Sequence, residues 1–104
     1  MANGRSKDGE GRRSRILVCD DERHVVRLIQ VNLERQGYEV VTAHCGQEAI
    51  ELLKREHFDI AVLDPAMPDL SGFDVKEWID DHEETREMKV ILLDGKPWDW
   101  KLRF

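Results

Sequence analysis

The chain has 104 residues, a formal net charge of −6 and 40% hydrophobic residues, which fits one small globular domain rather than several. No apolar run approaches the roughly 20 residues needed to span a bilayer, and the basic N-terminus lacks the apolar core of a secretory signal. We therefore expect a cytoplasmic protein without membrane attachment. The two cysteines, Cys19 and Cys45, have no CxxC spacing, which gives no case for a disulfide framework or a structural zinc site.

Charge is divided unevenly along the chain. Residues 1–15 contain five basic and two acidic side chains, whereas the remaining residues contain 11 basic and 20 acidic ones. Because an acidic body repels phosphates, we do not expect this domain to bind nucleic acid. Residues 1–14 are rich in Gly, Arg and Ser and show no apolar periodicity, which predicts a disordered basic leader. The folded domain is then predicted to span residues 15–104.

From Arg15 onward, the pattern predicts strands and helices in alternation. Ile16–Cys19 is a continuous apolar run, typical of a strand that is buried on both faces. A helix is predicted next, because residues at helical spacing precede a glycine that suits a helix end: Val25, Leu28, Ile29, Asn32 and Leu33, then Gly37. The remaining predicted elements are a strand over 38–42, a helix over 47–56, a strand over 60–63, a helix through Val75, Trp78, Ile79 and His82, and a strand over 90–93.

Strand and helix alternate three times, with connections short enough to require right-handed crossovers. This order predicts an α/β fold with a doubly wound parallel sheet. In such sheets, ligands bind beyond the carboxyl ends of the strands, at the point where the strand order reverses. The residues that directly follow each strand are therefore the first candidates for function.

Three acidic side chains stand at these strand ends. Asp20 and Asp21 follow the first predicted strand, and Asp64 follows the third. Carboxylates that lie a few ångströms apart raise one another's pKa unless a positive charge compensates them. Mg²⁺ is the usual remedy, since it takes one or two protein carboxylates and leaves positions for phosphoryl oxygens. The pattern therefore predicts a magnesium site at the carboxyl edge of the sheet.

Further short motifs occur in a fixed order along the chain. They are Arg15-Ile-Leu-Val-Cys-Asp-Asp-Glu22, Gly37-Tyr38-Glu39-Val40, Thr42-Ala43 through Gly46-Gln47-Glu48-Ala49, Phe58-Asp59-Ile60 through Leu63-Asp64, and Met67-Pro68 with Ser71-Gly72. This string resembles the receiver domain of response regulators from Arg15 to about Leu93. The resemblance implies a flavodoxin-like sheet and a signalling module, not an enzyme, that receives a phosphoryl group from a histidine kinase or phosphotransfer protein.

The resemblance also implies roles for individual residues. Asp64 takes the place of the phospho-acceptor. Asp21 and Asp64 are expected to hold Mg²⁺ directly, together with the backbone carbonyl of Ala66, whereas Asp20 is expected to act through a bound water. The metal would neutralise charge that builds on the phosphoryl oxygens.

The sequence departs from the family after the fourth predicted strand. The family places a Thr or Ser at the position of Asp94, and an acid there would repel a phosphorylated Asp64. Only eleven residues follow Leu93, too few for the helix, strand and helix that complete the family's fold. The sheet is therefore expected to be shortened after its fourth strand, with residues 94–104 replacing the last three elements.

Three explanations of residues 94–104 remain open. Lys96-Pro97-Trp98 resembles the family's Lys-Pro-aromatic sequence after a deletion, in which case Lys96 could approach Asp64 as a catalytic residue. Alternatively, apolar and charged residues alternate over 98–104, which predicts a strand that returns at Asp94-Gly95 to cover the edge of the fourth strand. The third explanation is a truncated or frame-shifted end without a designed role.

These features support more than one function. The first hypothesis is a phosphoacceptor domain that depends on Mg²⁺. The second is a degenerate receiver that binds partners independently of phosphorylation, and the third is a non-functional fragment. Because the missing elements would leave apolar sheet uncovered, we also expect a homodimer through an exposed sheet edge. His24 is expected to lie exposed on the first helix, and Cys19 and Trp78 are expected to lie in the core.

Overall fold

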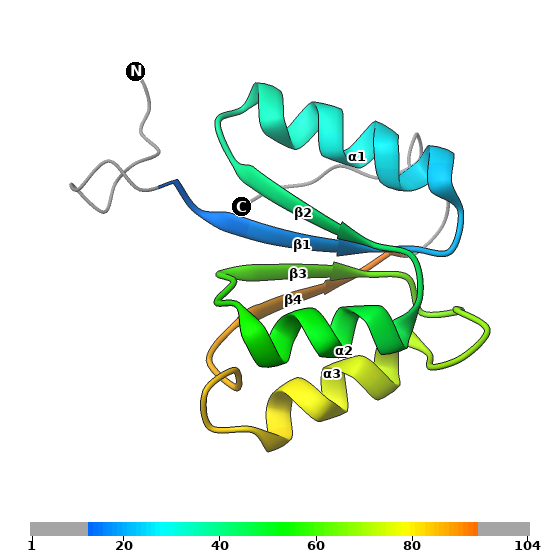
Figure 1. The fold of residues 1–104 in the computed structure, drawn as a ribbon, viewed down its shortest axis with the longest axis vertical. Helices are drawn as coiled ribbons and strands as arrows, with labels where there is room; N and C mark the ends of the chain where they lie inside the picture. Colours follow the sequence, from blue (N-terminus) through cyan, green and yellow to red (C-terminus); the bar gives the residue numbers. More distant parts are fainter. Residues whose placement is uncertain (1–12, 94–104) are drawn as a thin grey trace.

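Seven elements alternate along residues 13–93, the part of the chain that the computed structural model describes (Figure 1). They are β1 (Arg15–Cys19), α1 (Arg23–Arg35), β2 (Glu39–Ala43), α2 (Gly46–Arg55), β3 (Ile60–Leu63), α3 (Gly72–Asp81) and β4 (Lys89–Leu92). The predicted leader therefore lies almost entirely outside the described residues. Its last residue, Ser14, is described, and the Ser14 carbonyl accepts a hydrogen bond from the Glu39 N–H (3.0 Å). Asp94, Lys96 and the three explanations of residues 94–104 lie outside the described part.

The four strands form one parallel sheet in the order β2-β1-β3-β4. Helix α1 covers one face, and α2 and α3 cover the other, so the chain reverses its direction across the sheet after β2 (Figure 1). The predicted doubly wound parallel sheet is confirmed. Because all strands run in one direction, their carboxyl ends meet at a single edge.

The core has two halves, one on each face of the sheet. Successive strand residues point to opposite faces, so Leu17 and Cys19 of β1 pack towards α2 and α3, whereas Ile16 and Val18 pack towards α1. All four are fully buried, as the continuous apolar run predicted. Each large side chain buried in this way contributes about 1.5–3 kcal/mol to stability.

Several boundaries and positions differ from the predictions. Helix α2 begins at Gly46, one residue early, and β2 and β4 are each displaced by one residue from the predicted range. Leu28 is 44% exposed, because it lies on the flank of α1 and not on the stripe that faces the sheet. His82 ends α3 as its C-cap and stacks on Trp78 with 3.8 Å between ring centroids. Trp78 is only partly buried against the core. His24 is exposed, as expected.

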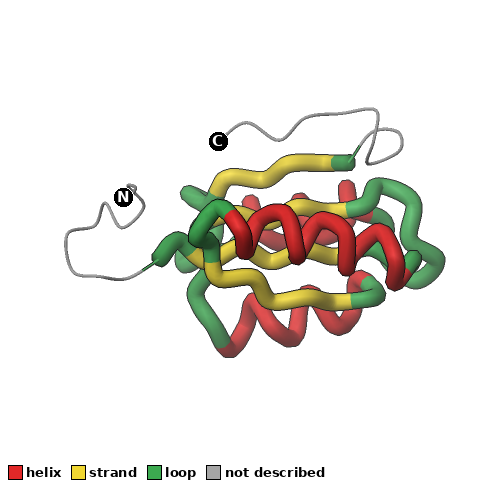
Figure 2. The backbone as a smooth tube through the Cα atoms, turned by 90° about the horizontal axis from the view of Figure 1, so that it is seen from above, coloured by secondary structure: helices red, strands yellow, loops and turns green. Residues whose placement is uncertain are grey.

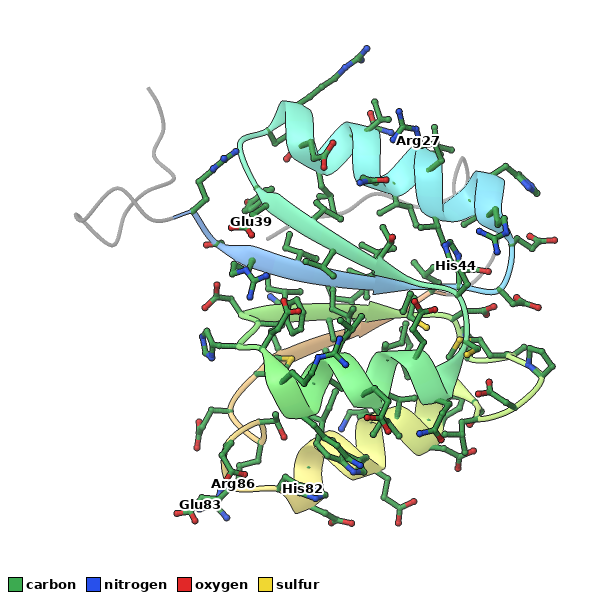
Figure 3. All side chains as sticks on the ribbon, viewed as in Figure 1. Arg27, Glu39, His44, His82, Glu83 and Arg86 are labelled. Atoms are coloured by element: carbon green, nitrogen blue, oxygen red, sulfur yellow. The ribbon has the colours of Figure 1, made fainter. Side chains whose placement is uncertain are left out.

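Within residues 13–93, no helix is long and apolar enough to span a bilayer. The two ends of the sheet have different polar surroundings. Figure 3 shows Glu39 and His44 at opposite ends of β2. Glu39 marks the amino end and His44 follows the carboxyl end, where the strand-end acids are found.

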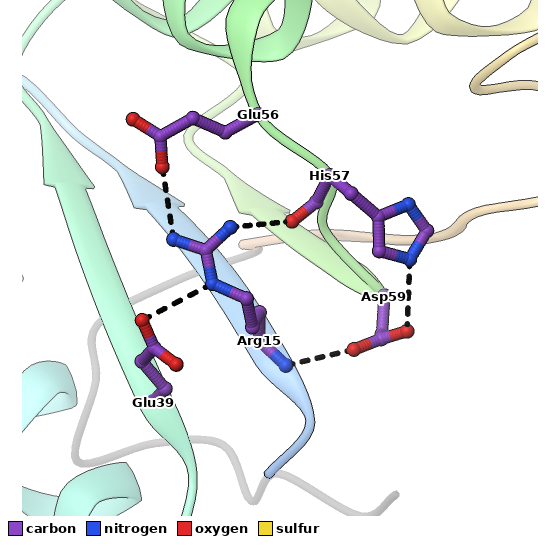
Figure 4. A network of polar contacts seen from close by, with 5 residues as sticks. All are labelled: Arg15, Glu39, Glu56, His57 and Asp59. Atoms are coloured by element: carbon purple, nitrogen blue, oxygen red, sulfur yellow. Dashed lines mark hydrogen bonds and ion pairs between the residues drawn. The ribbon is translucent and has the colours of Figure 1, made fainter. Parts of the chain in front are cut away.

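At the amino end of the sheet, Arg15 contacts residues of β2 and of the segment between α2 and β3 (Figure 4). The Arg15 guanidinium forms ion pairs with Glu39 (3.1 Å) and Glu56 (2.9 Å) and donates to the His57 carbonyl (2.7 Å). It also lies 4.9 Å from the centroid of the Phe58 ring. The Arg15 backbone N–H donates to the Asp59 carboxylate (2.8 Å). Arg15 therefore ties the start of β1 to β2 and to the segment between α2 and β3.

Replacing this side chain should weaken the fold without touching the strand-end acids. We expect Arg15→Ala to lower the free energy of unfolding by about 1–3 kcal/mol, because two carboxylates and a carbonyl lose a shared donor. Arg15→Lys should recover only part of this loss, since an ammonium lacks the planar fork. Urea unfolding measures both. Lys54→Ala removes an exposed pair with Glu51 (3.7 Å) and should change stability by less than about 0.5 kcal/mol; an equal loss in both variants would contradict the role of Arg15.

Candidate functional site

The three strand-end acids meet at the carboxyl edge of the sheet. Asp20 and Asp21 follow β1, Asp64 follows β3, and these two strands are direct neighbours with Cys19 beside Leu63. Each acid offers a carboxylate oxygen, and these three oxygens lie within 4.8 Å of one another. We call these residues the acid cluster. The prediction that they come together in space is confirmed.

The members of the acid cluster differ in exposure. Asp20 is buried, Asp64 is half-buried and Asp21 is exposed. One Asp20 carboxylate oxygen accepts a hydrogen bond from the Glu22 N–H (2.9 Å), which favours the ionised form. Burial outweighs this bond and, together with the nearby Asp64 carboxylate, raises the pKa of Asp20 to about 7. The cluster therefore contains more negative charge than its protein surroundings compensate.

Asp64 begins the β3–α3 loop, residues 64–71. Its backbone N–H donates to the Cys19 carbonyl (2.9 Å), which fixes it against the end of β1. One of its carboxylate oxygens accepts a hydrogen bond from the Ala66 N–H (3.1 Å), so the loop turns around this side chain. The Asp64 carboxylate also faces the buried Asp20 carboxyl, with which it forms a side-chain hydrogen bond.

The end of this loop packs directly on the Asp64 backbone. The Gly72 N–H donates to the Pro65 carbonyl (3.3 Å). A Cβ atom on Gly72 would lie 2.5 Å from the Asp64 carbonyl oxygen and 3.0 Å from the Pro65 Cα. Ser71 caps α3 by accepting from the Asp74 N–H, while the Asp74 carboxylate accepts from the Ser71 N–H (both 3.0 Å). The start of α3 is therefore a fixed support for Asp64.

A second support comes from α2. The Asp69 carboxylate accepts hydrogen bonds from the Gly46 N–H (2.9 Å) and the Gln47 N–H (2.8 Å), the first backbone donors of that helix. Desolvation alone would raise the pKa of Asp69, but these backbone donors hold it below its usual value. Gly46 also packs closely on Leu70, where a Cβ atom would lie 2.6 Å from the Leu70 Cβ. The middle of the loop is thus bound to α2.

The Asp69 contact leads to a testable prediction. We expect Asp69→Ala to lower the free energy of unfolding by about 0.5–2 kcal/mol, because two N–H groups at the α2 N-terminus lose their acceptor. Asp69→Asn keeps one acceptor oxygen and should lose less. Thermal unfolding measures the difference, and amide exchange at Gly46 and Gln47 should speed up in the alanine variant. Unchanged exchange at these two amides would contradict the proposed support.

Sulfur atoms fill the space beneath the loop. Cys19 Sγ lies 3.2 Å from Met67 Sδ and 3.2 Å from the Cys45 carbonyl oxygen. Burial strongly raises the pKa of the Cys19 thiol, so it stays protonated and packs as a small apolar group, as predicted. Both cysteines are free. Met67 is buried and anchors the loop from below.

The acid cluster has the chemistry of a site for a hard divalent cation. All its donors are carboxylate oxygens, which Mg²⁺ prefers, and the exposure of Asp21 leaves room for water or a ligand. Ala66 lies beside Asp64 in the loop. Among residues 13–93, this is the only cluster of three or more candidate metal-binding side chains.

Fold and site together define a doubly wound α/β protein with an acidic crevice at the carboxyl edge of its parallel sheet. Residues 16–97 match the model of the response regulator receiver domain. The chain therefore belongs to the response regulator receiver domain family, whose members are signalling modules.

Curated relatives agree with this assignment. The chain is 49% identical over 82 residues to the alkaline phosphatase synthesis transcriptional regulatory protein PhoP of Bacillus subtilis, covering 79% of this chain and 33% of that protein. It is 32% identical over 78 residues to the polar-differentiation response regulator DivK of Brucella ovis, covering 75% of this chain and 63% of that protein. The chain thus spans between a third and two thirds of the length of these relatives.

Solved structures share the fold. The N-terminal domain of a response regulator receiver protein from Methanoculleus marisnigri is 36% identical, with a TM-score of 0.75 over 80% of this chain and 68% of that one. Response regulator TrrA from Thermotoga maritima, solved in complex with Mg²⁺-BeF, is 37% identical, with a TM-score of 0.71 over 76% of this chain and 67% of that one. These similarities confirm the flavodoxin-like architecture that the sequence predicted.

Proposed function

We propose that this chain is the phosphoacceptor domain of a two-component phosphorelay and that Asp64 receives the phosphoryl group. The observation that supports this most is the convergence of Asp20, Asp21 and Asp64, whose carboxylate oxygens lie within 4.8 Å of one another. The donor is a phosphohistidine on a histidine kinase or a phosphotransfer protein. Since the acids follow the same strands as in the family's pattern, their roles are carried over position by position.

In the proposed transfer, a carboxylate oxygen of Asp64 attacks phosphorus. A bond forms between this oxygen and phosphorus, the bond from phosphorus to the histidine nitrogen breaks, and the nitrogen keeps the electron pair. The product is an acyl phosphate. Asp21, Asp64 and the Ala66 carbonyl would hold Mg²⁺, with Asp20 acting through a bound water. Bound Mg²⁺ supplies compensation for the charge that spreads over the phosphoryl oxygens.

The main contribution of the protein to the proposed transfer is to hold the Asp64 carboxylate in position. Asp64 is fixed by its backbone bond to Cys19, by the Ala66 N–H and by the close packing of Gly72. Fixing a nucleophile in this way lowers the entropic part of the barrier. The loop supports at Asp69 and Ser71 serve the same purpose.

An acyl phosphate donor tests the proposal without the cognate kinase. The full chain is incubated with acetyl phosphate and Mg²⁺, and its intact mass is measured. We expect one added phosphoryl group in the wild type and in Asp81→Asn, an exposed acid on α3, and none in Asp64→Asn. Loss of the added mass at alkaline pH would identify an acyl phosphate. Labelling that survives Asp64→Asn would contradict Asp64 as the acceptor.

The metal is tested separately. Response regulator TrrA was solved in complex with Mg²⁺-BeF, so beryllofluoride with Mg²⁺ is a suitable probe for this chain. Each ligand that binds only the folded state raises the melting temperature. We expect a rise with Mg²⁺ and a further rise with beryllofluoride, and no further rise in Asp64→Asn.

A phosphorylation-independent interaction module is the second candidate. It is favoured by Asp94, an acid at the position where the family has Thr or Ser. Binding of a partner that is unchanged by Asp64→Asn would support it.

Under the phosphoacceptor proposal, Lys96, which lies outside the described residues, is the proposed cationic partner of the phosphoryl group. Lys96→Ala should then slow labelling of Asp64. We further propose that the protein acts in the cytoplasm.

A further inference from the structure

A pocket of about 190 Å³ lies at the amino end of the sheet. One wall is formed by residues 53–58, which end α2 and lead into β3, and the other by Glu84, Thr85 and Met88, which precede β4. Figure 2 shows the connecting loops gathered at the two ends of the strands, so this pocket and the acid cluster lie at opposite ends of the sheet. The proposed phosphotransfer therefore does not use the pocket.

The base of the pocket is mainly apolar. Leu53 is 5% exposed and Phe58 is 2% exposed, and Met88 packs partly buried against the same half of the core. The wall before β4 is held in place by hydrogen bonds. The Thr85 hydroxyl donates to the Ile79 carbonyl (2.8 Å), and the Met88 N–H donates to the Thr85 carbonyl (2.9 Å). The pocket therefore offers a formed apolar surface to a ligand.

Two exposed side chains of opposite charge line the rim of this pocket. Within residues 13–93, neither the Arg55 guanidinium nor the Glu84 carboxylate forms an ion pair or a hydrogen bond. They belong to opposite walls, since Arg55 ends α2 and Glu84 lies between α3 and β4. The other ionisable side chains of the lining have partners: Glu56 pairs with Arg15 (2.9 Å), Lys54 with Glu51 (3.7 Å) and His57 with Asp59 (3.3 Å).

We propose that this pocket binds a zwitterionic α-amino acid with an apolar side chain of about the size of leucine. The Arg55 guanidinium binds the α-carboxylate of the ligand, and the Glu84 carboxylate binds its α-ammonium group. The carboxyl end of a helix carries a partial negative charge, so the end of α2 also favours the ammonium group. The apolar side chain of the ligand packs on Leu53, Phe58 and Met88.

Size and charge narrow the class of ligand. A cavity of about 150 Å³ holds a benzene ring, whereas sites for drug-sized ligands have volumes of about 300–1,000 Å³, so a nucleotide is too large. A simple anion would be attracted by Arg55 but repelled by Glu84, and a simple cation would meet the reverse arrangement. A ligand that carries both charges satisfies both side chains.

Titration of the full chain with L-leucine, followed by its amide NMR signals, tests the pocket. We expect saturable shifts at the amides of residues 53–58 and 84–88 and none at the acid cluster. Isocaproate lacks the ammonium group of leucine and isoamylamine lacks the carboxylate, so each should bind at least about tenfold more weakly. Glycine, without the apolar side chain, should also bind more weakly. The absence of saturable shifts would overturn the proposal, and so would equal binding of isocaproate or glycine.

Variants at the two charged side chains separate recognition from folding. We expect Arg55→Gln and Glu84→Gln each to weaken leucine binding at least about tenfold without changing the melting temperature, because both side chains are exposed. Arg55→Gln should not weaken the binding of isoamylamine, and Glu84→Gln should not weaken that of isocaproate. Arg27→Gln removes an exposed cation from α1 and is the matched control. An equal loss of leucine binding in this control would reject the assigned contacts.

The pocket and the proposed phosphotransfer can be tested independently. Asp64→Asn should bind L-leucine as tightly as the wild type does, since the acid cluster lies at the other end of the sheet. Arg55→Gln should accept a phosphoryl group from acetyl phosphate as the wild type does. Loss of leucine binding in Asp64→Asn would contradict a pocket that is separate from the acid cluster.

Discussion

Replacing Gly72 by alanine should destabilise the protein by about 2–4 kcal/mol, even though alanine is a better helix former than glycine by roughly 1 kcal/mol. The new Cβ would lie 2.5 Å from the Asp64 carbonyl oxygen, 2.9 Å from the Asp64 carbonyl carbon and 3.0 Å from the Pro65 Cα. All three atoms belong to the backbone, so no side-chain rotation relieves the contact. Either α3 moves outward or the peptide between Asp64 and Pro65 is displaced.

Movement of α3 and displacement of the peptide between Asp64 and Pro65 would both change the position of Asp64 in the acid cluster. We expect urea unfolding to show the loss of stability, and labelling by acetyl phosphate to slow by at least about tenfold, since small displacements of a positioned nucleophile are costly. Phe73→Ala is the matched control, because Phe73 is the next residue on α3 and its side chain is 61% exposed. It should change neither measurement appreciably. A variant at Gly72 that is as stable as the wild type would contradict the close packing.

Replacing Asp20 by asparagine should have two effects of opposite sign. Without metal at pH 8, we expect the free energy of unfolding to rise by about 1–3 kcal/mol, because a buried carboxylate next to Asp64 becomes neutral. The amide oxygen can still accept from the Glu22 N–H, which the carboxylate does at 2.9 Å. The increase in melting temperature that Mg²⁺ produces in the wild type should largely disappear.

The pH dependence follows from the same group. The pKa of Asp20 is raised to about 7 in the folded protein, whereas the unfolded value is about 3.9. Between these values the folded state binds more protons than the unfolded state, so this group lowers stability as pH rises from about 4 to about 7. Above pH 7 its unfavourable contribution is complete. Asp20→Asn should remove this part of the pH profile.

Melting curves at several pH values, recorded without metal and again with Mg²⁺, measure both effects of Asp20→Asn. A variant that is less stable than the wild type at pH 8 would show that the carboxylate is not under repulsion. A variant with an unchanged response to Mg²⁺ would remove Asp20 from the proposed metal site. Asp81→Asn, at an exposed position of α3, should leave both measurements unchanged.

The parts of the fold that could be predicted from the sequence are those that short stretches of consecutive residues determine. Continuous apolar runs such as Ile16–Cys19 and Ile60–Leu63 identify strands buried on both faces, and the helix predicted between successive strands indicates that they are parallel. Once the strands are parallel, acids at their carboxyl ends must share an edge. The convergence of Asp20, Asp21 and Asp64 could therefore be predicted from the sequence, and the 4.8 Å cluster confirms it.

The supports of the site have no such local signal. Asp69 reaches the first N–H groups of α2, 22 and 23 residues away, and nothing around Asp69 distinguishes it from any loop acid. Gly72 could be read as part of the loop, but its close packing on the Asp64 backbone depends on how α3 meets β3. Arg15 is predicted only as the first residue of the folded domain, yet its side chain joins β1 to β2 and to the segment between α2 and β3.

The predicted burial of Leu28 and Trp78 was wrong in degree, because helical spacing alone does not determine which residues of a helix pack in the core. Leu28 follows Val25 by three residues, which suggested the buried stripe, but Val25, Val26, Ile29 and Leu33 already fill the face of α1 that packs on the sheet. Trp78 has the spacing of a core residue, but it is only partly buried and packs at the margin of the core, where its indole stacks on His82. Periodicity locates a face without saying how wide the contact is.

The opposite charge arrangements at the two ends of the sheet make ionic strength act on them in opposite directions. Mobile salt ions screen the repulsion among Asp20, Asp21 and Asp64, which favours the folded state without metal. The same ions weaken the attraction between Arg15 and its partners Glu39 and Glu56. A melting curve reports the sum of the two effects. Salt therefore shifts local stability from the amino end of the sheet towards the carboxyl end, and residue-level exchange would reveal this where a single midpoint would not.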